Sequence, residues 1–324
     1  MSERRKYGAA ALLAALSIIL LAGCGPKPPE DSTRVMFDTV VRISLRPEPG
    51  YDPAPLFREL WQIAERYDLA LDPYDPESEL SRLNDCESAF IPGAELLRAL
   101  KAGKAAIPRT GGNFDFRIGE VALLWDFSGG GRVPDSAEIL AALERMHTPL
   151  GTRGDSVIKN GAAPRLDFGG LAKGMVVDHL YSVLDTASRV ERFLLDFGGN
   201  IRGGSRSGES FRIGVRDPRE SSKVMGSFEL PPGKACATAG DYQRYFAVGG
   251  VRYHHILNPE TGRPARRCRA VTVIAPTALE ADIISTALFV MGPDAGTEYI
   301  STRGNIDAIF TDSTGENIPS GLSF

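Results

Sequence analysis

The stretch LDFGGLAKGMVVD, from Leu166 to Asp178, joins an apolar segment to a helical pattern through two adjacent glycines. The residues before the glycines predict a short strand, and those after them predict a helix with Lys173 in its first turn. Glycine lets the backbone approach another group closely, because it has no Cβ. Two alternatives follow: a tight strand-to-helix junction with an exposed lysine, or a junction that approaches a ligand.

Upstream of this stretch the pattern is mainly helical. Alternating β-branched residues over 34–46 predict a strand, and apolar residues at positions 56, 60, 63, 64, 67 and 71 predict a helix over 54–71. Further helices are expected over 92–107 and 135–146, the second with Asp135 or Ser136 as its N-cap.

Downstream, short strands predominate. They are expected over 156–160, 163–168, 192–205, 211–217, 224–231 and 234–240, interrupted by one helix over 171–187. Residues 198–204 are glycine-rich but lie between two strands, so they predict a hairpin turn. The chain ends on a strand over 270–276, a helix over 277–292, a further helix and a strand over 306–310. This mixed order predicts an α+β fold, a single mixed α/β domain with two lobes over 34–324, and argues against a doubly wound parallel sheet.

The N-terminus has the pattern of an export signal. Arg4, Arg5 and Lys6 precede an apolar run over 9–22, which is shorter than the ~20 residues of a membrane span. The run ends in Leu-Ala-Gly-Cys, which resembles the lipobox of bacterial lipoproteins. We therefore expect a signal peptide over 1–23, lipidation of Cys24, a tether over 24–33 and a location on the periplasmic side of a bacterial membrane. An uncleaved anchor with an incidental cysteine is the alternative.

The charge and the cysteine content bear on which partners and which metal or disulfide sites the protein can have. The 324 residues carry a formal net charge of -4, and without a basic block this argues against a nucleic-acid partner. Cys86, Cys236 and Cys268 lack metal-ligand spacing. They allow either one disulfide with a cysteine left over or three buried free thiols, which we favour.

Two pairs of polar residues are candidates for chemistry. Asp282 and Thr286 lie four residues apart, hence on one helical face. Their oxygens suit Mg²⁺, which completes its shell with waters and substrate phosphates. The alternative is a structural aspartate held by an arginine, with Thr286 bonded back to its helix. His254 and His255 lie in a predicted hairpin, and only one of two adjacent strand residues faces a given cleft. The alternative is one surface histidine and one core histidine.

Several ordered blocks together resemble the ApbE family, the FAD:protein FMN transferases. The blocks are YDPESELSRLN (74–84), GGNFDFRIGEVALLW (111–125), LDFGGLAKGMVVD (166–178), LLDFGGNI (194–201), ATAGDYQRYF (237–246), YHHILNPETGRP (253–264) and VTVIAPTALEADIISTALFVMG (271–292). We call the block over 166–178 the opening stretch. The resemblance spans nearly all of the mature chain and implies an ApbE-like, T-fold-like architecture.

The resemblance also implies a reaction. Mg²⁺-dependent cleavage of the FAD pyrophosphate would pass FMN to a Thr or Ser hydroxyl of a partner protein and release AMP. Acceptors implied for the family are subunits of sodium-pumping NADH:quinone reductase or Rnf-type electron-transfer complexes. An FAD pyrophosphatase that releases free FMN and a non-catalytic flavin-binding lipoprotein are the competing functions. The sequence alone separates the transferase from the pyrophosphatase poorly, because both use the same metal and the same pyrophosphate.

Site residues follow by carrying the family pattern onto this chain. The resemblance implies FAD contacts at Met36, Tyr74, Asn113, Phe114, Asp115, Lys173 and Met175, and metal ligands at Asp282, Thr286 and the carbonyl of Ala172. It implies His255 as the base that accepts the hydroxyl proton, with Asp282 as the alternative base. Two positions depart from the family pattern: Ala239 replaces a serine, and Asn258 replaces an aspartate before Pro259. Each removes a polar or charged group near the expected site.

Overall fold

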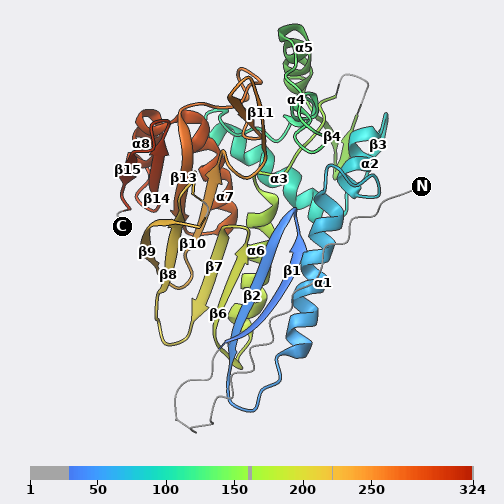
Figure 1. Ribbon diagram of the computed structural model, residues 1–324. Helices are drawn as coiled ribbons and strands as arrows, with labels where there is room; N and C mark the ends of the chain where they lie inside the picture. Colours follow the sequence, from blue (N-terminus) through green and yellow to red (C-terminus); the bar gives the residue numbers. More distant parts are fainter. Residues whose placement is uncertain (1–28, 160–162, 221, 323–324) are drawn as a thin grey trace, which may run out of the picture.

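The main element of the fold is an eight-stranded sheet, shown in Figure 1. The computed structural model describes residues 29–159, 163–220 and 222–322. The strands, in spatial order, are β1 (Glu30–Met36), β2 (Thr39–Pro47), β6 (Val190–Phe197), β7 (Asn200–Ser205), β10 (Ala235–Gly240), β13 (Cys268–Ala275), β14 (Asp307–Asp312) and β15 (Asn317–Ser320). Every neighbouring pair is antiparallel. This confirms the α+β class and excludes a doubly wound parallel sheet.

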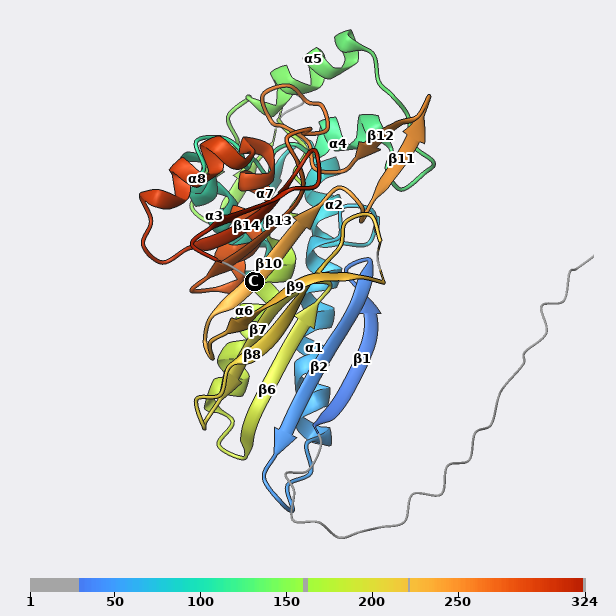
Figure 2. The same ribbon diagram turned by 60° about the vertical axis from the view of Figure 1, so that its left-hand side comes forward.

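Helices cover one face of the sheet, and a hairpin covers part of the other (Figure 2). The covering helices include α1 (Ala54–Leu71), α6 (Ala172–Thr186) and α7 (Ala278–Met291), and the hairpin joins β8 (Phe211–Arg216) to β9 (Val224–Leu230). Side chains alternate across a strand. Leu195 therefore packs into the main core beneath the helices, while its neighbour Leu194 packs beneath the hairpin.

The helix-rich end of the molecule carries a separate small core. The elements at this end include α2 (Glu79–Asp85), α3 (Ala94–Arg109), α4 (Gly119–Trp125) and α5 (Ser136–Met146). A small sheet of β3 (Ala89–Phe90), β4 (Gly151–Arg153) and β5 (Ser156–Ile158) lies with them. The hairpin of β11 (Tyr245–Val248) and β12 (Val251–His254) joins this lobe, and α8 (Pro293–Ser301) follows α7. Trp125 is fully buried and packs with Ile139 and Leu257. Asp135 caps α5 as predicted, with Glu138 completing a capping box.

The first strand differs from the prediction in two ways. Residues 34–46 form a hairpin, because Phe37 and Asp38 take left-handed backbone angles (φ 52° and 55°) and turn the chain between β1 and β2. Asp68 stabilises this turn by accepting a hydrogen bond from the Phe37 amide at 3.0 Å. Moreover, residues 30–33, expected in the tether, already belong to β1. Because the side chains of this strand segment are exposed or partly exposed, its residues are polar and lack the alternating apolar pattern that predicts a strand.

The segment before the opening glycines is the second correction. Leu166–Phe168 is extended but is not a strand. The Asn84 side chain satisfies both backbone groups of Leu166, donating to its carbonyl at 2.9 Å and accepting from its amide at 2.8 Å. The amide of Asp167 donates to the Phe116 carbonyl at 2.7 Å. A side chain and a loop thus take the place of a neighbouring strand.

Cys24 lies outside the described residues, so its predicted lipidation stays a prediction. In the part of the chain that the structure describes, none of the helices combines the length and apolar character needed to cross a membrane. Cys86, Cys236 and Cys268 are free thiols, as favoured above; Cys236 and Cys268 are buried, whereas Cys86 is partly exposed.

Candidate active site

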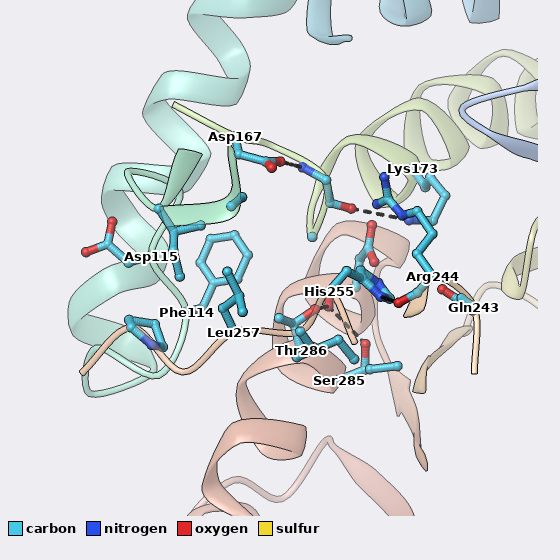
Figure 3. A pocket seen from close by; sticks show the side chains of 18 of the residues that line it. Phe114, Asp115, Asp167, Lys173, Gln243, Arg244, His255, Leu257, Ser285 and Thr286 are labelled. Carbon is cyan, nitrogen blue, oxygen red and sulfur yellow. Dashed lines mark hydrogen bonds between the residues drawn. The ribbon is translucent and has the colours of Figure 1, made fainter. Parts of the chain in front are cut away.

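A cavity opens where the N-terminal turn of α6 meets α7 and the segment after β12 (Figure 3). It brings together eight of the residues proposed from the sequence: Tyr74, Asn113, Phe114, Asp115, Lys173, His255, Asp282 and Thr286. These residues come from five separate stretches of the chain. Their convergence on one cavity is the main structural support for a functional site.

Asp282 and Thr286 line the cavity from α7. The Asp282 side chain is buried (5% exposed), and its Oδ2 accepts a hydrogen bond from the Gly174 amide at 2.9 Å. Its structural partner is therefore a backbone amide of α6 and not an arginine. The Thr286 hydroxyl donates to the Asp282 carbonyl at 3.2 Å, which leaves its oxygen lone pairs available.

The glycines of the opening stretch let α6 and Phe114 pack against α7. A Cβ on Gly174 would lie 2.4 Å from the Ala278 carbonyl oxygen, and one on Gly170 would lie 2.9 Å from the Phe114 ring and 3.2 Å from the Thr286 hydroxyl. The distance from Gly174 to α7 is too short for any side chain, and the distance from Gly170 to Thr286 is tighter than most contacts of a Cβ atom. The junction therefore approaches another chain segment, and this close packing places the glycine turn on the cavity wall.

Asp178, the last residue of the opening stretch, binds the N-terminus of α7. The Asp178 carboxylate accepts hydrogen bonds from the amides of Ala278 (2.8 Å) and Leu279 (2.9 Å), at the start of α7. It also pairs with Arg202 at 2.6 Å. A carboxylate at a helix N-terminus satisfies free amides and complements the helix dipole. One stretch of sequence thus binds α7 at two points, through the Gly174 amide and the Asp178 carboxylate, both of which follow Lys173.

Lys173 projects from the first turn of α6 into the cavity (Figure 3). Its Nζ donates to the Gly169 carbonyl at 3.3 Å, while the Asp167 carboxylate accepts from the Gly169 amide at 2.7 Å. No carboxylate of the described residues forms an ion pair with the ammonium, so its charge is available to an anionic ligand.

His254 and His255 face opposite sides, as expected for adjacent residues at the end of a strand. His254 is buried against Phe289, and burial lowers its pKa to about 4. His255 lines the cavity, and its Nδ1 lies 3.2 Å from the Arg244 carbonyl oxygen. A carbonyl only accepts, so Nδ1 carries the proton and Nε2 keeps its lone pair. Burial, followed by the neighbouring Arg244, holds the pKa of His255 well below its ordinary value.

Three of the predicted FAD-contacting residues that line the cavity are Tyr74, Phe114 and Asp115. Tyr74 lies on an irregular segment, as expected, and is 43% exposed; desolvation, followed by the Asp167 carboxylate, raises its pKa. Phe114 presents its ring beside Gly170. The Asp115 carboxylate is already bound by Arg117 at 2.6 Å, and Figure 3 shows it pointing away from Lys173 and His255. Asp115 therefore already has a structural partner in Arg117.

Met36 and Ala172 line a second cavity that adjoins the first. The two cavities share five lining residues and so lie side by side: Tyr74, Asp167, Gly169, Lys173 and Arg244.

Met175 differs from its prediction, because it lines neither cavity and packs in the main core at 7% exposure. Two residues advance a helix by about 200°, which turns Met175 away from the face that carries Lys173.

Sequence reasoning missed Arg244 and Asp167 as site residues. Both line the two cavities, and Arg244 also pairs with Asp38 at 3.6 Å. Each lies within a block that carries the family resemblance, and this position in the sequence could have identified it as a site residue. Ala239, the departure from the family pattern, does line the cavity, whereas Asn258 closes a turn by accepting from the Glu260 amide at 2.8 Å.

The oxygen atoms of the cavity fit a hard cation only together with a ligand. Among the described residues, no cluster of three or more His, Cys, Asp or Glu side chains suits a metal ion. Asp282 and Thr286 share one cavity, and Ala172 lines the adjoining one. One carboxylate, one hydroxyl and one carbonyl match Mg²⁺ when substrate phosphates complete its shell.

Comparison with known proteins agrees with the fold and identifies the family. The model of the ApbE family matches residues 37–310. The chain therefore belongs to the ApbE family. The FAD:protein FMN transferase of Vibrio cholerae is 32% identical over 298 residues, which cover 88% of each chain.

Solved structures show the same architecture. The crystal structure of the ApbE protein of Thermotoga maritima matches with a TM-score of 0.82 and 30% identity, over 90% of this chain and 97% of that chain. The apo form of the flavinyl transferase ApbE of Pseudomonas stutzeri matches with a TM-score of 0.79 and 28% identity, over 91% and 98%. Both the family resemblance and the fold class expected from the sequence are confirmed.

Proposed function

We propose that this member of the ApbE family is an FAD:protein FMN transferase, which moves FMN from FAD to a Thr or Ser hydroxyl of a partner protein and releases AMP. The observation that carries the proposal is the meeting of Asp282, Thr286, Lys173 and His255 in one cavity. An oxygen-ligand pair, a cation and an uncharged imidazole are the groups that pyrophosphate cleavage by a hydroxyl requires. The curated relatives bear the same activity in their names.

The diphosphate of FAD belongs beside α7 and the first turn of α6. Asp282 and Thr286 would hold Mg²⁺ there together with the phosphate oxygens, and Lys173 would neutralise a further phosphate charge. When bound, Mg²⁺ supplies Lewis-acid polarisation of the phosphoryl group. The flavin belongs on the wall of Tyr74 and Phe114, because aromatic rings pack well on a flat ring system.

His255 is the group that accepts the hydroxyl proton. Its lowered pKa keeps the imidazole neutral, and the Arg244 carbonyl fixes the proton on Nδ1. Nε2 then takes the proton as the hydroxyl oxygen bonds to the phosphorus of the FMN half. The bond from that phosphorus to the bridging oxygen breaks, and AMP leaves with the bridging oxygen. Asp282 is less suited to this role, because its carboxylate faces the proposed metal and accepts from Gly174.

The acceptor and the location complete the proposal. The acceptor is a subunit of a sodium-pumping NADH:quinone reductase or of an Rnf-type complex, as the family resemblance implies. A lipid anchor on Cys24 would hold the enzyme on the periplasmic side of a bacterial membrane, near such complexes. These assignments rest on the N-terminal sequence pattern and on the resemblance.

The test incubates the full chain with FAD, Mg²⁺ and a purified acceptor domain. Flavin fluorescence that persists on the acceptor in a denaturing gel, with an equal amount of AMP, is the expected result. FMN and AMP without labelled acceptor would instead identify an FAD pyrophosphatase, and unchanged FAD would identify a flavin-binding lipoprotein. His255→Ala should lose acceptor labelling while still binding FAD.

A further inference from the structure

Positive charge is concentrated in one stretch of this acidic protein. Residues 244–269 contain six arginines and one carboxylate, Glu260, a local charge of about +5 in a chain of net charge -4. The absence of a basic block inferred from the net charge therefore overlooks the run from Arg263 to Arg269. This stretch begins at the catalytic cavity with Arg244 and His255.

Three of these arginines line a surface groove next to the cavity. The groove, which we call the arginine groove, is lined by Arg263, Arg266 and Arg267 together with Trp125, Tyr253, Asn258, Thr261, Pro264, Ala265 and Val290. Only the thickness of one chain segment separates it from the cavity, because Leu257 and Pro259 line the cavity whereas Asn258, between them, lines the groove.

The three guanidinium groups are held in place without being neutralised. Arg263 donates to the Ser136 hydroxyl at 3.0 Å, Arg266 to the Arg252 carbonyl at 2.8 Å and Arg267 to the Met291 carbonyl at 2.9 Å. All three side chains are exposed, and none forms an ion pair with a carboxylate of the described residues. Arg266 also stacks over the Tyr253 ring. Fixed, uncompensated charges favour binding of an anionic partner, because little side-chain entropy remains to be lost.

We propose that the arginine groove binds an acidic segment of the acceptor protein, close in its chain to the hydroxyl that receives FMN. This inference rests on the proposed function, since it concerns the partner of the same reaction. A few residues of extended chain, at about 3.3 Å each, span the short distance between groove and cavity.

Charge complementarity is the argument for this occupant. The acidic segment meets attraction at the groove, whereas the remainder of the enzyme, with a formal charge near -9, repels it from other surfaces. The aromatic side chains beside the arginines suit a polypeptide, which offers apolar as well as charged groups. The same net negative charge disfavours a nucleic acid.

The experiment compares two fluorescein-labelled 15-residue peptides by fluorescence anisotropy. Each carries one central Thr; one has four Glu residues on one side of it, and the other has Gln in their place. The full chain is titrated with and without FAD. We expect the Glu peptide to bind at least about tenfold more tightly, with an advantage that shrinks as salt is raised.

Two enzyme variants of equal charge complete the design. Arg263→Glu with Arg266→Glu should remove the preference for the Glu peptide and raise the KM for an acceptor domain about tenfold, with little change in kcat. Arg58→Glu with Arg212→Glu, on exposed sites of α1 and β8, is the control and should leave both unchanged. Arg263→Gln with Arg266→Gln should give an intermediate effect.

The outcomes separate this inference from the proposed function. Equal affinity for both peptides, an equal loss in both variants, or an oligo-dT 15-mer that binds as tightly as the Glu peptide would overturn the groove assignment. Peptide binding requires no turnover, so it tests the groove even if the enzyme proves to hydrolyse FAD. Unchanged FAD affinity in the double variant shows that the fold and the cavity are intact.

Discussion

At the scale of single residues, Asp282 serves two purposes that one substitution can separate. Its Oδ2 accepts from the Gly174 amide, and the carboxylate also provides the one formal negative charge proposed for the metal. An asparagine keeps an oxygen for the amide and removes the charge, whereas an alanine removes both.

We expect Asp282→Asn to fold like the wild type and to lose Mg²⁺-dependent FAD cleavage by at least about a hundredfold, because a metal contributes several kcal/mol to the transition state. Asp282→Ala should lose the same activity and also some stability, since the buried Gly174 amide loses its partner. AMP release by chromatography and thermal unfolding measure the two effects. Near wild-type cleavage by the asparagine variant would contradict the metal assignment.

Substitution of Tyr74 tests whether the flavin packs on the cavity wall formed by Tyr74 and Phe114. Its ring is 43% exposed and lies on an irregular segment, so it contributes little to the core. Tyr74→Phe should keep FAD affinity, while Tyr74→Ala should weaken it by about 1 kcal/mol, the scale of one aromatic contact, or roughly fivefold in Kd. Calorimetry with FAD measures the affinity. Product ratios at fixed acceptor should also show more free FMN for the alanine variant, because an open wall admits water. Unchanged affinity with an unchanged ratio would make Tyr74 structural.

At the scale of secondary-structure elements, the site depends on how closely α6 and α7 approach. Gly174 has no room for a side chain, because the Ala278 carbonyl oxygen would lie 2.4 Å from its Cβ. Because α6 and α7 pack this closely and the Gly174 amide also donates to Asp282, the position of Asp282 depends on the packing of the two helices.

Gly174→Ala should therefore destabilise the protein by about 1–3 kcal/mol, the usual cost of overpacking, and reduce FAD cleavage by displacing Asp282. Gly304→Ala is the matched control, because a Cβ there meets nothing within 4 Å. Urea unfolding and AMP release measure the two effects. A Gly174→Ala variant as stable and active as the control would show that the helices separate without harm.

At the scale of the whole molecule, burial of His254 links stability to pH. Its pKa is about 4 in the folded state, against an ordinary value of 6.5. Between these values the unfolded chain binds a proton that the folded chain does not, so stability is complete above pH 6.5 and falls as the pH falls toward 4. The contribution amounts to about 3 kcal/mol.

We expect burial of His254 to contribute a decrease of about this amount to the free energy of unfolding, measured in urea, between pH 7 and pH 4. His254→Gln keeps a donor for the Ala265 carbonyl, which accepts from His254 at 2.7 Å, and should reduce the dependence by that share, leaving the part due to His255 and His179, whose pKa values are also lowered. His147→Gln, at an exposed site, should leave it unchanged. A slope that stays the same in His254→Gln would assign the pH dependence to other groups.

The proposed membrane attachment also concerns the whole molecule. The charged start, the short apolar run and the Leu-Ala-Gly-Cys end predict that Cys24 is acylated. Cys24→Ser should leave a precursor of unchanged size that incorporates no labelled palmitate, whereas Cys86→Ser, the control, should be processed normally. Palmitate incorporation that persists without Cys24 would reject the assignment.

Local pattern in the sequence was sufficient for much of this protein. The 3.6-residue period placed α1, α3, α5, α6 and α7 within a few residues, and the same period put Asp282 and Thr286 on one face. Alternation along a strand required His254 and His255 to face apart, and one is in the core while the other lines the cavity. These properties depend on neighbours a few residues away, so the sequence contains them directly.

The tertiary structure alone decided the features that depend on distant partners. The turn at Phe37 and Asp38 contains no glycine and places a bulky aromatic residue in the left-handed region, and Asp68 holds it. Leu166 avoids a strand because Asn84, 82 residues away, satisfies its backbone. Periodicity sets spacing along a helix but not its rotation about its own axis, and packing of α6 on α7 turned Lys173 toward the cavity and Met175 into the core. Cavity walls, unpaired arginines and lowered histidine pKa values likewise arise from groups that only folding brings together.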